Sequence, residues 1–190
     1  MEAALVILAI PLGLLLLLAL WVAVLYNGLV RHRNHVAESW SDIDTELKRR
    51  YDLIPNLVET VKGFAAHEKD VFERVIAARH AAMANHASLK DQARDENALV
   101  GSLRQLFAVS EAYPVLKSNE NFLKLQEELT NTEDRIQRAR RFYNANVRDL
   151  NNRVLTVPSN LVANMFGFKT REFFEIEDAS VRQPPAVKLS

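Results

Sequence analysis

The sequence contains no cysteine, and it has only five glycines and six prolines among its 190 residues. The absence of cysteine excludes disulfides, thiolate zinc sites, cysteine nucleophiles and a lipid anchor attached through cysteine. So few glycines and prolines argue against a sheet-rich fold with many tight turns, whereas the abundant Ala, Leu, Glu, Arg and Lys favour helices. The composition therefore predicts an all-α protein.

Neither sign of charge is in excess, because Lys and Arg total 24 and Asp and Glu also total 24. A nucleic-acid-binding domain normally presents a broad basic surface. A near-neutral chain of mixed charge offers no such surface, so we expect no nucleic-acid partner.

Motifs for catalysis and cofactor binding are also missing. The glycines stand far apart, which excludes a P-loop and a Rossmann motif, and no Glu-x-x-His pair typical of carboxylate-bridged metals occurs. His67 and Glu68 begin like a zinc-protease motif, but Val71 stands where its second histidine is required. His32 and His35 have a spacing that could hold a metal, although solvated side chains near the lipid headgroups explain them better. The sequence predicts no enzyme, no cofactor and no metal site.

One long hydrophobic run dominates the N-terminus. From Ala3 to Val30 no side chain is charged, and this run exceeds the ~20 residues that a bilayer crossing requires. A cleaved signal peptide would have a basic start, a shorter apolar stretch and a small-residue cleavage site. We therefore predict an uncleaved, single-pass transmembrane anchor over residues 1–30, with the lipid bilayer as its partner.

Basic residues follow this run at once. Arg31 and Arg33 lie directly behind it, whereas the other flank carries only the α-amino group and Glu2. The positive-inside rule then places the N-terminus outside and the following residues in the cytoplasm. These juxtamembrane arginines could also attract an anionic leaflet by about 1 kcal/mol each, and a simple orientation signal explains them at least as well.

A single apolar stripe runs through the first helix that follows the anchor. It consists of Val36, Trp40, Ile43, Leu47, Tyr51, Ile54, Val58, Val61 and Ala65. Pro55 cannot donate to the carbonyl of Tyr51, so we expect a helix bend or a restart there, with no change of face. Polar residues on the other side of this stretch form a candidate interaction surface: Arg49, Arg50, Asp52, Asn56 and Glu59.

Three more apolar stripes predict three more long helices. The first spans about residues 68–85, the second begins after a capping box at Ser88 and Asp91 and ends at Pro114, and the third has a coiled-coil-like repeat from Phe122 to Leu150. A short helix capped by Ser159 and closed by Gly167 follows. Four amphipathic helices with short links predict an antiparallel, up-and-down four-helix bundle over residues 31–170, followed by a polar, mobile tail over 171–190.

Several stretches make the chain resemble the LemA family of bacterial membrane proteins. They are "YNGLV", "ESWSDIDTELKRRYDLIPNLVETVKGFAAHE", "EAYPVLKSNENFLKLQEELTNTEDRIQRARRFYN" and "FGFKTREFF". The resemblance implies a single N-terminal span, a mainly helical bundle and no established catalytic activity. It also implies family associations with envelope stress, with a membrane zinc protease of the HtpX type and with membrane shaping.

These observations lead to one main hypothesis and two alternatives. The main one is a non-enzymatic, membrane-anchored helical scaffold at the cytoplasmic face of a bacterial inner membrane, assembled as a homo-oligomer or around a partner. The alternatives are a homo-oligomeric membrane-remodelling protein and an adaptor of an HtpX-type protease.

Overall fold

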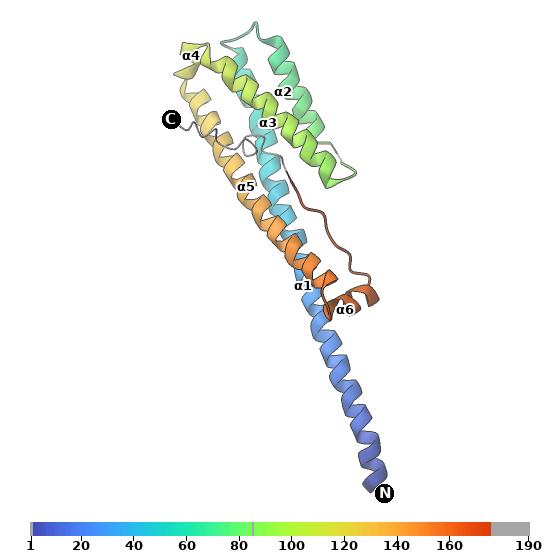
Figure 1. Ribbon diagram of the computed structural model, residues 1–190. Coiled ribbons are helices and arrows are strands. Elements are labelled where there is room, and N and C mark those ends of the chain that lie inside the picture. Colours follow the sequence, from blue (N-terminus) through green and yellow to red (C-terminus); the bar gives the residue numbers. More distant parts are fainter. Residues whose placement is uncertain (1, 85, 176–190) are drawn as a thin grey trace, which may run out of the picture. The chain divides into compact units, whose positions relative to one another are not determined.

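The computed structural model describes residues 2–84 and 86–175, with side chains from residue 9 onward. Within these ranges all regular secondary structure is helical, which confirms the all-α prediction. The helices are α1 (Glu2–Lys62), α2 (Lys69–Ala82), α3 (Leu89–Glu111), α4 (Pro114–Lys117), α5 (Glu120–Leu155) and α6 (Ser159–Met165) (Figure 1). The chain divides into two compact units: Met1–Asp42 with Ala139–Glu172, and Ile43–Arg138 with the residues from Phe173 onward.

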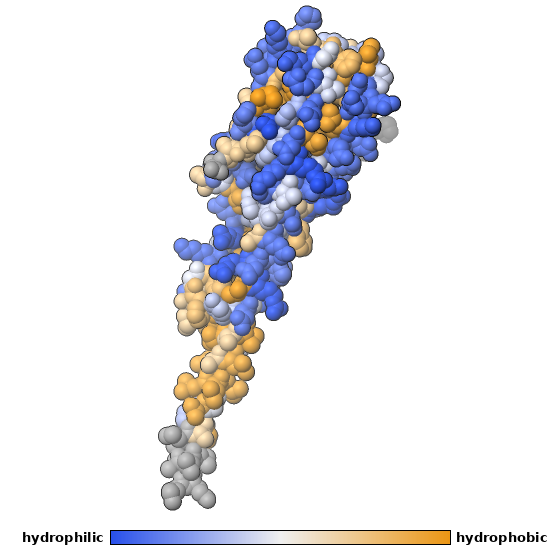
Figure 2. All heavy atoms as spheres, turned by 180° about the vertical axis from the view of Figure 1, so that it is seen from behind, coloured by the Kyte–Doolittle hydropathy of each residue, from blue (hydrophilic) through white to orange (hydrophobic). Residues whose placement is uncertain are grey.

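The N-terminal part of α1, in the first unit, is covered by exposed apolar side chains. They include Ile10, Leu12, Leu14, Leu15, Leu16, Leu17, Leu18 and Leu20. Figure 2 shows them as a continuous hydrophobic surface on the part of α1 in view. This helix is long and apolar enough to cross a membrane, and none of its most apolar window is buried by the rest of the chain. Such a surface is unfavourable in water, so this part of α1 lies in a lipid bilayer.

The first unit is held together by packing between α1 and the C-terminal half of α5. Leu29 and Val36 of α1 are buried, as are Tyr143, Val147, Leu150 and Val154 of α5. The rings of Trp40 and Tyr143 meet edge to face with centroids 5.5 Å apart. The Tyr143 hydroxyl donates to the carbonyl of Glu172 at 3.1 Å, which holds the segment after α6 against α5.

Helix α6 ends as predicted but begins differently. Ser159 is the first residue of the helix and not its cap, because its hydroxyl donates to the carbonyls of Arg153 and Thr156. At the other end Gly167 has φ +70°, and Phe168 N–H donates to the Ala163 carbonyl at 2.9 Å. These features form a Schellman-type C-cap, in which glycine adopts the left-handed conformation without a steric penalty.

The second unit is a four-helix bundle made of α1 from Ile43 onward, α2, α3 and the first half of α5 (Figure 1). Short links reverse the chain between successive helices, as the sequence predicts. The apolar stripe of α1 is buried here, and Ile43, Leu47, Ile54 and Val61 have no exposed surface. At the predicted capping box, the Ser88 hydroxyl accepts a hydrogen bond from Asp91 N–H at 3.1 Å and fixes the start of α3.

Pro55 does not interrupt α1, which continues as one helix to Lys62. The predicted restart is therefore wrong, and the bend stays a prediction. In the predicted tail, Arg171 is tied to Asn151 by hydrogen bonds of 2.9 and 2.8 Å, and Phe174 is fully buried. The rest of that tail, residues 176–190, lies outside the described residues.

Candidate functional site

Four of the five residues of the predicted interaction surface lie on one exposed face of α1. Arg49, Asp52, Asn56 and Glu59 follow one another at steps of three and four, and all are exposed. Intrahelical ion pairs flank this face: Arg49 lies 3.8 Å from Glu46, and Lys62 lies 3.4 Å from Glu59. We call these four residues the docking face.

Arg50 does not belong to this face, and its prediction as a surface residue is wrong. Its side chain is only 1 % exposed and lies inside the four-helix bundle. The guanidinium donates to the carboxylate of Glu96 on α3, and it donates to Glu133 on α5 at 2.7 Å. A buried guanidinium requires such partners, because an unpaired charge in the core is strongly unfavourable.

Glu96 is the centre of this buried polar cluster. Its side chain has no exposed surface, and it accepts hydrogen bonds from Arg50 and from the Tyr51 hydroxyl. Burial raises the pKa of Glu96 above the ordinary value of a glutamate, although the charge of Arg50 and the two hydrogen bonds oppose this shift. Burial and the neighbouring Glu96 carboxylate also raise the pKa of Tyr51, so its hydroxyl stays protonated and acts as a donor.

Pro55 and Arg79 take part in a link between α1 and α2. The proline lacks an N–H, so it leaves the carbonyl of Tyr51 without its usual intrahelical donor. The Nε–H of Arg79 donates to this carbonyl at 2.7 Å. The guanidinium of α2 thus takes the hydrogen bond that the proline cannot make, which gives Pro55 a structural role in joining the two helices.

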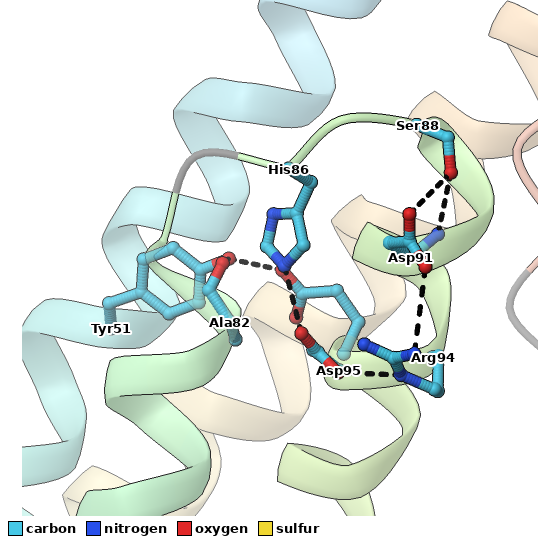
Figure 3. A network of polar contacts seen from close by, with 8 residues as sticks. Tyr51, Ala82, His86, Ser88, Asp91, Arg94 and Asp95 are labelled. Carbon is cyan, nitrogen blue, oxygen red and sulfur yellow. Dashed lines mark hydrogen bonds and ion pairs between the residues drawn. The ribbon is translucent and has the colours of Figure 1, made fainter.

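A third group of polar contacts fixes the start of α3 (Figure 3). His86 lies 3.0 Å from the carboxylate of Asp95, which also accepts from Arg94 at 3.0 Å. The hydrogen bond from Arg94, followed by that from His86, lowers the pKa of Asp95. These residues tie the loop after α2 to α3.

This arrangement uses acids and bases to hold helices together. Glu96 accepts hydrogen bonds from both Arg50 and Tyr51, and Glu133 is the member that reaches the solvent, with 33 % of its side chain exposed. Among residues 2–84 and 86–175, no group of three His, Asp or Glu side chains could hold a metal ion. The cluster is therefore suited to specifying which helices pack together.

The sequence carried a signal for this cluster. Arg50 lies in phase with Leu47 and Ile54 on the apolar stripe of α1, and Glu96 lies in phase with Leu99 and Leu103 on α3. Charged residues on core stripes of two helices can be expected to meet. Glu133 is also in phase with the buried Leu129 and Ile136 of α5, although a third of its side chain stays exposed.

The juxtamembrane arginines lie in the first unit and, unlike Arg50, are not buried. Both Arg31 and Arg33 are exposed. The guanidinium of Arg33 lies 5.6 Å from the ring centroid of Phe168, a cation–π distance. His35 lies 3.6 Å from Glu38, so its contact is with an acid on the same helix.

Comparisons with known proteins agree with the resemblance to the LemA family. The family model described as LemA matches residues 39–189. Two proteins of Paramagnetospirillum magneticum, Magnetosome protein MamQ 1 and Magnetosome protein MamQ 2, are each 27 % identical to this chain, and Magnetosome protein MamQ of Magnetospirillum gryphiswaldense is 25 % identical. Each alignment covers 81 % of this chain and 66 % of the relative, so the chain spans less than two thirds of the length of these relatives. Because the family model covers most of the chain, this protein belongs to the LemA family.

Proposed function

We propose that this protein is a non-enzymatic, membrane-anchored helical scaffold that holds a partner protein at the cytoplasmic face of a bacterial inner membrane. The observation that carries the proposal is the continuity of α1, since one helix bears both the lipid-exposed apolar stretch and the docking face. A protein bound to that face is thereby tethered to the bilayer.

The chemistry of the docking face suits a protein partner. Arg49, Asp52, Asn56 and Glu59 offer both signs of charge and an amide, all exposed along one side of a helix. A partner with complementary charges would gain specificity more than affinity from these groups. The internal pairing of Arg50, Glu96 and Tyr51 favours a structural role over a catalytic one.

Site-specific crosslinking in native membranes tests the proposal. The chain has no cysteine, so Asn56→Cys provides a single attachment point for a photoreactive label on the docking face. The matched control is Glu127→Cys, an exposed position on α5 of the same unit. We expect a defined protein adduct from position 56 and a much weaker one from position 127. Equal labelling at both positions, or no adduct at either, would contradict the docking role.

The cytoplasmic orientation can be tested with the same reagents. In intact cells, a membrane-impermeant maleimide should not react with Asn56→Cys, and permeabilisation should expose this cysteine. Reaction in intact cells would show that the bundle lies on the outer side.

A homo-oligomeric membrane-remodelling protein is the second candidate. The names of the relatives place those proteins at magnetosomes, which favours a role in organising membranes. Crosslinking between identical chains, together with altered curvature of liposomes that contain the protein, would favour this candidate. Liposomes of unchanged shape would count against it.

An adaptor for an HtpX-type membrane zinc protease is a third candidate, and it rests on family resemblance. Deletion of the protein should then change the turnover of that protease's substrates. Unchanged turnover removes this candidate and leaves the scaffold proposal intact.

A further inference from the structure

A group of large apolar side chains is exposed in the first unit, at the end of α5, in the turn that follows and on α6. These residues are Leu155, Val157, Leu161, Met165 and Phe166, and we call them the apolar patch. Leu161 and Met165 are one helical turn apart and share a face of α6, and Met165 is 72 % exposed. Val162 and Ala163 of the same helix are buried, so α6 has one face in the protein and an apolar face outside it.

The apolar patch lies beside the helix that carries the membrane-spanning stretch. The ring of Phe166 lies 4.8 Å from the ring of Tyr26 on α1, and Phe168 lies 5.7 Å from Tyr26. A Cβ placed on Gly28 would lie 3.5 Å from Nη1 of Arg153, near the end of α5. Figure 1 shows α6 next to α1 in this unit.

The length of the apolar run sets the depth of this contact. A hydrocarbon core about 30 Å thick needs about 20 helical residues, and the uncharged run from Ala3 to Val30 is longer than that. A span that ends near Trp21 leaves Tyr26 about 7.5 Å farther along the helix axis. That position lies in the interfacial layer, where tryptophan and tyrosine are enriched. Phe166 packs on Tyr26 and therefore lies at the same level.

The charge around the apolar patch matches an anionic lipid surface. Residues 150–171 include Arg153, Lys169 and Arg171 but no Asp or Glu, and with the flanking Asp149 and Glu172 the basic side chains still outnumber the acids by three to two. All three basic residues are exposed. Exposed apolar groups together with basic side chains are typical of helices that lie in a membrane interface.

We propose that α6 and the turn before it form a second membrane contact. The apolar patch enters the interfacial layer of the bilayer that α1 crosses, and Arg153, Lys169 and Arg171 meet anionic lipid headgroups. This contact fixes the rotation of α1 about its own axis and holds the first unit against the membrane surface. The inference requires that α1 spans the bilayer, and it is independent of any partner on the docking face.

Fluorescence quenching in proteoliposomes tests the proposal on the full chain. Leu161→Cys and Met165→Cys are labelled separately with an environment-sensitive fluorophore. Leu14→Cys serves as the control within the membrane and Glu38→Cys as the exposed control in the same unit. Lipids with a nitroxide near the headgroup quench fluorophores in the interface, and iodide quenches fluorophores in water. We expect blue-shifted emission and strong nitroxide quenching at 161 and 165, stronger in vesicles with phosphatidylglycerol than in phosphatidylcholine alone.

Each other outcome has a distinct meaning. If 161 and 165 behave like Glu38→Cys while Leu14→Cys is shielded from iodide, the second membrane contact does not exist. If 161 and 165 are shielded from both quenchers, a second protein surface covers the apolar patch and the proposal is overturned. If iodide quenches the fluorophore at Leu14→Cys, α1 does not span the bilayer and the proposal is overturned together with its premise. This outcome is distinguishable from the absence of the second contact alone.

A charge substitution provides a second, independent test. With the fluorophore at Val157→Cys, the double change Leu161→Asp with Met165→Asp should abolish nitroxide quenching. Val115→Asp is the matched control, because Val115 is 70 % exposed and lies on α4 in the other unit. Retained quenching in the double variant would overturn the proposal. All these side chains are exposed, so the substitutions leave the core unchanged.

Discussion

Glu96→Ala is the most informative test of the buried polar cluster. The change removes the acceptor of Arg50 and of Tyr51 inside the four-helix bundle. Removing one partner of a buried ion pair typically destabilises a protein by about 3–5 kcal/mol. In this variant Arg50 retains its 2.7 Å hydrogen bond to Glu133, and the Tyr51 hydroxyl can still donate to the Ala82 carbonyl at 3.2 Å. We therefore expect a loss at the lower end, about 3 kcal/mol of unfolding free energy.

The double variant Arg50→Met with Glu96→Met separates the charge effect from the loss of packing. It removes both buried charges but keeps apolar volume in the core, so it should be far more stable than Glu96→Ala. The assay is urea unfolding of the full chain in detergent micelles, followed by helical circular dichroism. The reasoning is refuted if Glu96→Ala loses less than about 1 kcal/mol, or if the double variant is less stable than Glu96→Ala.

Three further predictions follow from the same contacts. Because the pKa of Glu96 is raised, protonated Glu96 contributes its full stabilisation below the ordinary glutamate pKa of 4.5, and this stabilisation is lost as the pH rises through the raised pKa. Glu96→Gln should remove this pH-dependent fall in the free energy of unfolding, measured by urea unfolding at a series of pH values. An unchanged pH profile in the variant would contradict the prediction. Arg79→Met should lower the free energy of unfolding by about 1–2 kcal/mol in the parent protein. The loss should be smaller in a Pro55→Ala background, because the new N–H at position 55 can reach the Tyr51 carbonyl. Equal losses in the two backgrounds would show that Arg79 does not replace the missing donor. Gly167→Ala should cost about 1 kcal/mol in thermal unfolding, since Gly167 has φ +70°, whereas Gly101→Ala on α3 should not destabilise.

The sequence predicts the helices well because their apolar stripes repeat at the helical period. Ile43, Leu47, Ile54 and Val61 are buried as their spacing predicts, and the capping box at Ser88 marks the start of α3. Each of these features depends on residues close together in the chain. Local pattern is therefore enough to place the long helices and the apolar anchor.

The candidate site was harder to predict because it depends on contacts between distant residues. Residue type places Arg50 on the surface, since charged residues are usually solvated, yet Glu96 and Glu133 on other helices neutralise it in the core. The role of Arg79 at Pro55 also depends on tertiary packing, because the sequence shows the missing donor but not its replacement. Residue type alone predicts Ser159 as a cap, whereas its hydroxyl donates to the Arg153 carbonyl in the fold.

The size of the complex extracted from native membranes tests the scaffold proposal most directly. The protein is released with its lipids in polymer nanodiscs, weighed by mass photometry and crosslinked for identification by mass spectrometry. We predict a protein mass well above the 21.6 kDa of one chain, and its loss when the docking face is reversed by Asp52→Lys with Glu59→Lys. The control variant Glu127→Lys with Asp134→Lys, on α5 of the same unit, should keep the complex. A single chain with no crosslinked partner would contradict the scaffold role.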